Sequence, residues 1–290
     1  MIAGGQIDGE IVSSAYIVEI HFYPNCNMIS EIIYKNVPDM AISNAYSFNE
    51  TCGGRFVLGG GLDSNDKVLN DVHEVDGQEF KPLPRLNEAR YEAGSCYINN
   101  RLYVCGGENN GAYLLDSIEM LHITTSDNAH EWELCETNLP CKVNSHTLTP
   151  FKGKIILIGG YVEGSISNKI WEGTLESKHD IKWKPMSPMQ KGRGNHFSVV
   201  VDDNIYVFGG LGSGNVLCEV FDGREWKLGP SFSFSLSTWN AQVVVDRKKR
   251  IIITTNEHGI VIYDHIKATI VSNTEYKLKE KRYGFAALLL

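Results

Sequence analysis

Histidine and cysteine are the residues of this sequence that could bind a metal or act as nucleophiles, and their spacing favours neither role. The nine histidines are scattered, with no HxH and no HExxH arrangement, although zinc hydrolases place two histidines one helical turn apart. The seven cysteines include no CxxC pair, no GxSxG nucleophile elbow occurs, and thiols such as Cys105 lie inside apolar runs. We therefore expect free buried thiols in a reducing compartment, no cofactor and no metal site.

Charge and hydropathy restrict the classes of partner. The formal net charge is −8, whereas generic nucleic-acid binding requires a basic face. No stretch is apolar for long enough to cross a bilayer, and residues 1–5 lack the basic and apolar regions of a secretory leader. The sequence therefore predicts a cytoplasmic protein that binds neither nucleic acid nor membrane.

The elements that position these side chains come from an internal repeat. Glycine doublets follow short apolar runs at five places, about 50 residues apart, and a sixth copy is degenerate at Thr255-Asn256. The doublets are Gly4-Gly5, Gly59-Gly60, Gly106-Gly107, Gly159-Gly160 and Gly209-Gly210. An aromatic residue near a proline or methionine ends each unit, as Trp226 does before Pro230. A regular period of this length indicates repeated supersecondary units.

The best-formed unit lies between Arg193 and Trp226. It predicts four short strands at residues 195–201, 204–208, 216–221 and 225–228, separated by turn residues. No window of the chain shows a sustained helical period. Each repeat is therefore expected to be a small antiparallel sheet.

The doublets, their period and the aromatic that follows each of them resemble the Kelch-repeat family over the whole chain. The resemblance implies an all-β, six-bladed β-propeller with four strands, A to D, in each blade, and it is strongest to the C-terminal propellers of BTB–Kelch adaptors. We expect one domain, residues 1–290, with blades at about 1–40 plus 282–290, 41–87, 88–142, 143–190, 191–235 and 236–281.

Ring closure is expected from the two ends of the chain. Residues 1–5 look like a strand B without its strand A, while residues 282–290 resemble the strand A segments that begin at Arg90 and Arg193. The tail should therefore pair beside Ile2-Ala3 as the inner strand of blade 1, which removes an exposed edge.

The B–C and D–A loops should form one face, and in Kelch adaptors that face holds partner peptides. Its B–C loops carry seven acids against Lys67, which predicts an electronegative rim that favours Lys or Arg in the partner. Arg90, Arg193 and Arg282 precede strand A, where they can also brace neighbouring blades. The candidate partner-binding residues are Asp8, Glu10, Asp63, Asp66, Glu92, Glu108, Tyr113, Glu163, Arg193, Asn195 and Trp239, and Glu257 is the remaining loop acid.

The resemblance also implies a function. The first expectation is a protein-interaction module that recognises substrates for a cullin-type ubiquitin ligase, with the BTB domain or cullin outside this chain. An actin or cytoskeletal scaffold is one alternative, and a Kelch-type sugar-acting enzyme such as a sialic-acid mutarotase is another. No enzyme is expected, because the metal-binding pattern ExxxDxxx(H/C) of the specifier proteins in this superfamily ends here on Lys184 after Glu176 and Asp180.

Overall fold

The computed structural model describes residues 2–3, 6–7, 10–22, 29–37, 39–40, 44–76, 79–123, 131–214, 218–229, 242–246, 248–255, 259–266, 269–273 and 286–287. Every element in these residues is a β-strand, and the strands form six four-stranded antiparallel sheets and two small hairpins. None of these described elements is a helix long and apolar enough to cross a membrane. The predicted all-β fold is confirmed.

Five sheets are each made by one continuous stretch of chain. In chain order, each sheet begins with its strand A and ends with its strand D. The sheets are β6–β9 (Phe48–Cys52, Arg55–Gly59, Val72–Asp76, Glu79–Leu83), β10–β13 (Gly94–Ile98, Arg101–Cys105, Ile118–His122, Glu133–Leu134), β14, β15, β18 and β19 (Thr147–Phe151, Lys154–Ile158, Ile170–Leu175, Ile181–Met186), β20–β23 (Phe197–Val201, Asn204–Phe208, Cys218–Phe221, Trp226–Leu228), and β24–β27 (Gln242–Val245, Arg250–Thr255, Gly259–Asp264, Thr269–Asn273).

The remaining four-stranded sheet joins the two ends of the sequence. Its order is β28 (Ala286–Ala287), β1 (Ile2–Ala3), β4 (Ala15–Phe22) and β5 (Ile29–Val37). Ile2 pairs with Ala287 and Ala3 with Ala286 in antiparallel register, so the predicted pairing of the tail with Ile2-Ala3 is confirmed. Two short hairpins, β2–β3 (Gln6–Ile7, Glu10–Ile11) and β16–β17 (Tyr161–Val162, Ser165–Ile166), project from B–C connections.

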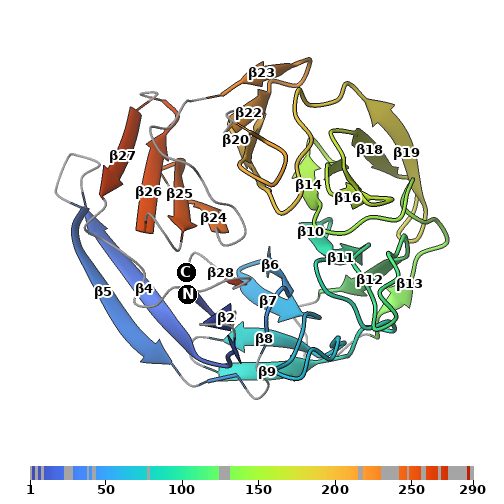
Figure 1. Ribbon diagram of the computed structural model, residues 1–290, viewed down its shortest axis with the longest axis horizontal. Coiled ribbons are helices and arrows are strands. Elements are labelled where there is room, and N and C mark those ends of the chain that lie inside the picture. Colours follow the sequence, from blue (N-terminus) through green and yellow to red (C-terminus); the bar gives the residue numbers. More distant parts are fainter. Residues whose placement is uncertain are drawn as a thin grey trace.

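The sheets are arranged around a central axis, with each strand A innermost (Figure 1). The inner strands contact one another in the closed order β6, β10, β14, β20, β24, β28 and back to β6. Each apolar cluster fills the seam between two consecutive sheets. One cluster, for example, packs Phe48 and Leu86 against Leu102 and Trp132, and another packs Phe151 and Met189 against Val207 and Phe221. The propeller is thus stabilised by burial between sheets.

The turns follow from their residue types. Both residues of the A–B turns Asn99-Asn100, Lys152-Gly153 and Asp202-Asp203 have positive φ, between 46° and 76°. This is the geometry of a type I′ hairpin turn, which matches the twist of the flanking strands and favours Asn, Asp and Gly. The predicted short A–B turns are therefore confirmed.

The glycine doublets allow the strand B end of one sheet to approach its neighbour. A Cβ atom on Gly159 would lie 2.5 Å from the Arg193 carbonyl oxygen, and φ there is +61°. In the second sheet the residues with this geometry are Gly60 and Gly61 (φ +64° and +92°), because Gly59 still belongs to β7. The doublet predicted at Gly59-Gly60 is therefore wrong by one position. In the last sheet, Asn256 of the degenerate copy Thr255-Asn256 lies outside the described residues.

Candidate partner-binding face

The B–C and D–A connections meet on one side of the propeller, which we call the loop face. Gly61 N–H donates to the Arg90 carbonyl at 2.8 Å, and Gly160 N–H donates to that of Arg193 at 2.7 Å. Each bond joins a B–C connection to the D–A connection that leads into the next sheet. At these two seams, neighbouring connections of the loop face are therefore joined through their backbones.

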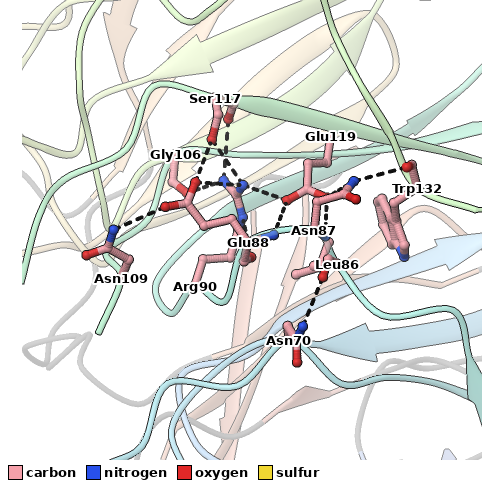
Figure 2. Close-up of polar contacts among 10 residues, drawn as sticks. All are labelled: Asn70, Leu86, Asn87, Glu88, Arg90, Gly106, Asn109, Ser117, Glu119 and Trp132. Carbon is pink, nitrogen blue, oxygen red and sulfur yellow. Dashed lines mark hydrogen bonds and ion pairs between the residues drawn. The ribbon is translucent and has the colours of Figure 1, made fainter. Parts of the chain in front are cut away.

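Two arginines that recur at the same place in the repeat lie beneath this face. Arg90 and Arg193 have no exposed side-chain surface, and they pair with the equally buried Glu119 and Glu219 at 2.8 and 3.0 Å. Arg90 also donates to the Gly106 carbonyl at 2.8 Å, as drawn in Figure 2. Both side chains are structural, because each joins its D–A connection to the sheet that the connection leads into. The assignment of Arg193 to the partner-binding face is wrong, because its charge is neutralised and enclosed. Arg282 lies outside the described residues.

The sequence patterns did not identify the acids that neutralise these arginines. Glu119 accepts hydrogen bonds from the Asn87 and Glu88 backbone N–H groups at 2.7 and 3.1 Å, and Glu219 does the same for residues 190 and 191. Each acid is the second residue of a strand C, directly after a buried residue. The sequence signal that could have identified these acids is the recurrence of a glutamate at the same place in the repeat, 29 residues after Arg90 and 26 residues after Arg193.

Four residues with a left-handed backbone conformation lie just before the inner strands β6, β10, β14 and β20. Their φ angles lie between 52° and 57°, and the residues are Tyr46, Glu92, Ser145 and Asn195. Each backbone N–H in this series donates to the carbonyl of the previous member, at 3.0 Å for Glu92 and 2.9 Å for Ser145 and Asn195. Glu92 and Asn195, both candidates for the partner-binding face, occupy the same place in this series. Both side chains are half-buried.

Glu92 and Glu108 meet at the seam between the third and fourth sheets. The amide nitrogen of Asn144 donates to Oε2 of Glu92 at 3.0 Å and to Oε2 of Glu108 at 3.3 Å. The Ser145 hydroxyl donates to the same Glu92 oxygen at 2.5 Å. Burial raises the pKa of Glu92, and the neighbouring Glu108 raises it further. We call Glu92, Glu108, Asn144 and Ser145 the acidic seam.

Tyr113 stands out from the loop face while its backbone is held in place. Its side chain is 70 % exposed. The Asn109 carboxamide oxygen accepts from Gly111 N–H at 3.0 Å and from Tyr113 N–H at 3.2 Å. A Cβ on Gly111 would lie 2.6 Å from the Tyr113 ring, so only glycine lets the ring pack on the backbone here. The structure thus places this candidate residue where a partner can reach it.

The loop before it is built in the same way, with an acid in place of the asparagine. Asp63 Oδ1 accepts from Asn65 N–H at 2.8 Å and from Lys67 N–H at 3.0 Å, so half-buried Asp63 orders its own loop. Asp66 takes the positive φ of that loop and is exposed. Asp63 therefore has a structural role in ordering its loop, in addition to any role in binding.

The other acids of the face occupy the two small hairpins. Glu10 is exposed in β3, and exposed Glu163 turns the β16–β17 hairpin with φ 50°. Asp8, Trp239 and Glu257 lie outside the described residues. Lys67 is not the sole base of the B–C connections, because exposed Lys169 follows β17. Lys142 and Lys191 in the D–A connections are exposed as well. The electronegative rim therefore stays a prediction, with more bases opposing it than the B–C loops suggested.

Two acids on the opposite side of the propeller each pair with a lysine and a histidine. Asp202 pairs with Lys249 and His265, which lower its pKa. Glu133 lies 2.9 Å from Lys178 and 2.5 Å from His179, and these two lower its pKa as well. The acidic seam differs from these sites, because within the part of the chain that the structure describes only neutral groups donate to its carboxylates.

The described residues offer little for metal or covalent chemistry. They contain no group of three or more His, Cys, Asp or Glu arranged to hold a metal. Burial raises the pKa of the Cys135 thiol to about 12 and lowers the pKa of His146 and His196 to about 3. These groups therefore stay neutral at physiological pH. That the protein is not an enzyme stays a prediction.

Comparison with known proteins gives a family model and distant relatives. Residues 49–221 match the model of the KLHDC2/KLHL20/DRC7 Kelch-repeats domain. The Kelch repeat and BTB domain-containing protein 1 of Ectromelia virus is 25 % identical over 168 residues, which are 54 % of this chain and 28 % of the relative. Beta-scruin of Limulus polyphemus is 24 % identical over 247 residues, 78 % of this chain and 25 % of the relative.

A solved structure titled "Structure of YjhT" superposes with a TM-score of 0.71 at 12 % identity, covering 94 % of this chain and 96 % of that one. At this identity the likeness concerns the fold alone. The chain spans about a quarter of the length of the curated relatives it matches.

Proposed function

Because this chain belongs to the Kelch-repeat family, we propose that it is a protein-interaction module that holds a segment of another protein on its loop face. Propellers of this kind carry variable loops on a rigid scaffold, where recognition residues gather. The six four-stranded sheets would then be six blades, and their boundaries would follow those expected from the repeat.

The observation that carries the proposal is Tyr113. An aromatic side chain that is 70 % exposed sits on a loop fixed by the Asn109 side chain and by Gly111. A preordered tyrosine loses little conformational entropy when a partner covers it, and tyrosine is enriched among residues that dominate binding energy. Half-buried acids lie in the same loop system, since Glu108 pairs with Leu114 in a backbone bridge.

A finer proposal concerns the cellular role. The chain would recognise substrates for a cullin-type ubiquitin ligase in the cytoplasm, with a BTB domain outside these residues. The viral relatives whose names include both a Kelch repeat and a BTB domain support this role. Their identity of 24–26 % makes the support coarse.

The test of the module is capture of synthetic peptides by the purified chain, compared with Tyr113→Ala. Loss of the aromatic anchor should weaken the captured peptides at least tenfold, about 1.4 kcal/mol. The matched control is Ile266→Ala, which removes a side chain 72 % exposed in the C–D turn between β26 and β27, on the opposite side of the propeller. Equal binding by the wild type and both variants would refute the loop face as the site.

The ligase role is tested in cells on a protein captured through Tyr113. Its ubiquitylation should fall when the chain is depleted and return with the wild type but not with Tyr113→Ala. Unchanged ubiquitylation on depletion would reject the adaptor role and leave the interaction module standing.

A further inference from the structure

The loop that carries Tyr113 also holds a chemically labile dipeptide. The sequence contains a single Asn-Gly pair, Asn110-Gly111. Both residues are exposed, and they are the central residues of a β-turn in which Ala112 N–H donates to the Asn109 carbonyl at 3.0 Å. An exposed asparagine that precedes glycine is prone to deamidation, because glycine has no Cβ to hinder attack by its own nitrogen.

Deamidation here needs only groups of the chain and water. The Gly111 nitrogen loses its proton to hydroxide and attacks Cγ of the Asn110 carboxamide, so that a C–N bond and a cyclic imide form while ammonia leaves. Water then opens the imide at either carbonyl, which gives aspartate or isoaspartate at position 110. Because the first step removes the amide proton, a contact that protects this N–H should slow the whole reaction.

The side chain of Asn109 holds the nitrogen that would attack. Its carboxamide oxygen accepts from Gly111 N–H at 3.0 Å and from Tyr113 N–H at 3.2 Å. The Asn110 carboxamide is held separately, because its oxygen accepts from Val68 N–H at 3.0 Å in the neighbouring B–C connection. The nitrogen and the carboxamide that must meet are therefore each bonded to a different group in the folded loop.

This cap is anchored to the buried network of the third sheet. Nδ2 of Asn109 donates to Oε1 of Glu88 at 3.1 Å, and Oε2 of Glu88 lies 4.0 Å from the Arg90 guanidinium (Figure 2). Asp63 caps the preceding loop through the same two backbone positions, but its carboxylate has no N–H to donate. The asparagine at position 109 therefore ties its cap to the D–A connection, which an aspartate could not do.

We propose that Asn110 is a deamidation site whose rate is controlled by the Asn109 cap. While the cap is closed, Gly111 N–H is protected and the reaction is slow. When the loop opens locally, the nitrogen is released and attacks the carboxamide. The bond from Asn109 to Glu88 keeps the cap closed, so its loss also accelerates the reaction. This inference concerns a modification of the chain, and it does not rest on the proposed function.

The modification changes the loop that presents Tyr113. Isoaspartate adds one carbon to the backbone between positions 110 and 111, and either product adds a negative charge. The longer backbone displaces Gly111 and Tyr113 from the Asn109 oxygen that accepts from both, so the tyrosine loses its preordered position. Any binding through Tyr113 is weakened as a result, because the partner must then order the loop.

The experiment follows the conversion of Asn110 by peptide mass spectrometry in the folded full chain, at mildly alkaline pH. The reference is a synthetic peptide of residues 105–117. We expect deamidation to be at least about tenfold slower in the chain than in the peptide, which corresponds to about 1.4 kcal/mol of opening free energy. Asn109→Ala should bring the rate to within about threefold of that of the peptide, and Glu88→Ala should raise it at least about threefold.

Two controls accompany these variants. Asp222→Ala removes a side-chain cap from the C–D turn on the opposite side, where Asp222 accepts from the N–H groups of Arg224 and Glu225, and should leave the rate at Asn110 within about twofold. Asn109→Asp keeps an oxygen acceptor but loses the donor to Glu88, so its rate should lie between those of the wild type and Asn109→Ala. A thermal melt of each variant verifies folding.

The outcomes decide the proposal without any partner. Equal rates in the chain and in the peptide overturn it, and so does an Asn109→Ala variant that reacts as slowly as the wild type. Hydrogen exchange at the Gly111 amide is a second readout, because it begins with the same removal of a proton; exchange that stays slow in Asn109→Ala also overturns the control by the cap. Failure of freshly purified wild type to capture peptides through Tyr113 overturns the proposed function alone, since the deamidation rates are measured independently of binding.

Discussion

Removing the Glu119 carboxylate tests whether the buried ion pairs hold the propeller together. Glu119 accepts from Arg90 at 2.8 Å, from the Asn87 amide side chain at 2.9 Å, and from two backbone N–H groups at 2.7 and 3.1 Å (Figure 2). Glu119→Ala removes the buried carboxylate that faces the Arg90 charge, leaves only Glu88 at 4.0 Å as a carboxylate partner, and leaves both backbone N–H groups without their acceptor. All of these donors belong to the D–A connection that leads into β10.

The magnitude follows from these contacts. Breaking a buried ion pair by removing one partner costs about 3–5 kcal/mol, and each stranded buried donor costs about 1–3 kcal/mol. Because these costs overlap when the loop relaxes, we expect a loss of at least about 4 kcal/mol in the free energy of unfolding. For a protein of this size, that lowers Tm by roughly 8–16 °C.

The assay is urea unfolding followed by tryptophan fluorescence, together with calorimetry. The control is Glu172→Ala, on the equivalent strand β18, whose partner Lys154 lies 2.5 Å away and is 39 % exposed. That half-exposed pair should contribute only about 0–1 kcal/mol. Replacing both Arg90 and Glu119 by apolar residues should cost less than Glu119→Ala alone. Equal effects of Glu119→Ala and Glu172→Ala would refute the reasoning.

Three further predictions concern stability and closure. Burial raises the pKa of Glu50 to about 7, so the folded state keeps a proton that the unfolded chain releases near pH 4.5, and the free energy of unfolding falls as pH rises between these values. In urea unfolding, Glu50→Gln should therefore gain up to about 3 kcal/mol of stability at pH 8 and none at pH 4. An equal gain at both pH values would contradict this. Deleting residues 282–290 removes β28, exposes the edge of β1, and should produce aggregates in size-exclusion chromatography; a monomer that melts like the full chain would disprove closure by the tail. Gly159→Ala should lower the free energy of unfolding by more than about 2 kcal/mol, because its Cβ would lie 2.5 Å from the Arg193 carbonyl oxygen. Gly164→Ala, at φ +77° with open space around the Cβ, should lower it by about 1 kcal/mol. Similar losses in thermal melts of the two variants would refute the close-approach argument.

Local residue types were enough to predict the strands and turns. The strands predicted at 195–201, 204–208 and 225–228 appear as β20, β21 and β23 within two residues. The doubly left-handed A–B turns follow from Asn, Asp and Gly at two-residue loops, because few other residues adopt positive φ at low cost. The doublet of the second sheet was displaced by one residue, because three consecutive glycines make the register ambiguous from sequence.

The candidate site was predicted only in part. Tyr113, Glu92 and Asn195 were chosen as candidates from their loop positions; Tyr113 is exposed, and the other two occupy equivalent places before their inner strands. The enclosure of Arg193 did not, because the acid that neutralises it comes 26 residues later on another strand. The number of opposing lysines was also underestimated, since it depends on which connections share a face.

By itself, the sequence determined the repeat, the antiparallel strands, the tight turns and the pairing of the two chain ends, because each depends on short-range patterns of glycine, apolar alternation and turn residues. Only the tertiary structure decided which polar groups neutralise one another. Arg90 reaches Glu119 across 29 residues, and Asn144 bridges Glu92 and Glu108 across 52 and 36 residues. Burial and charge compensation depend on what the neighbouring sheet brings to a seam, so the acidic seam became visible only when the sheets were placed side by side.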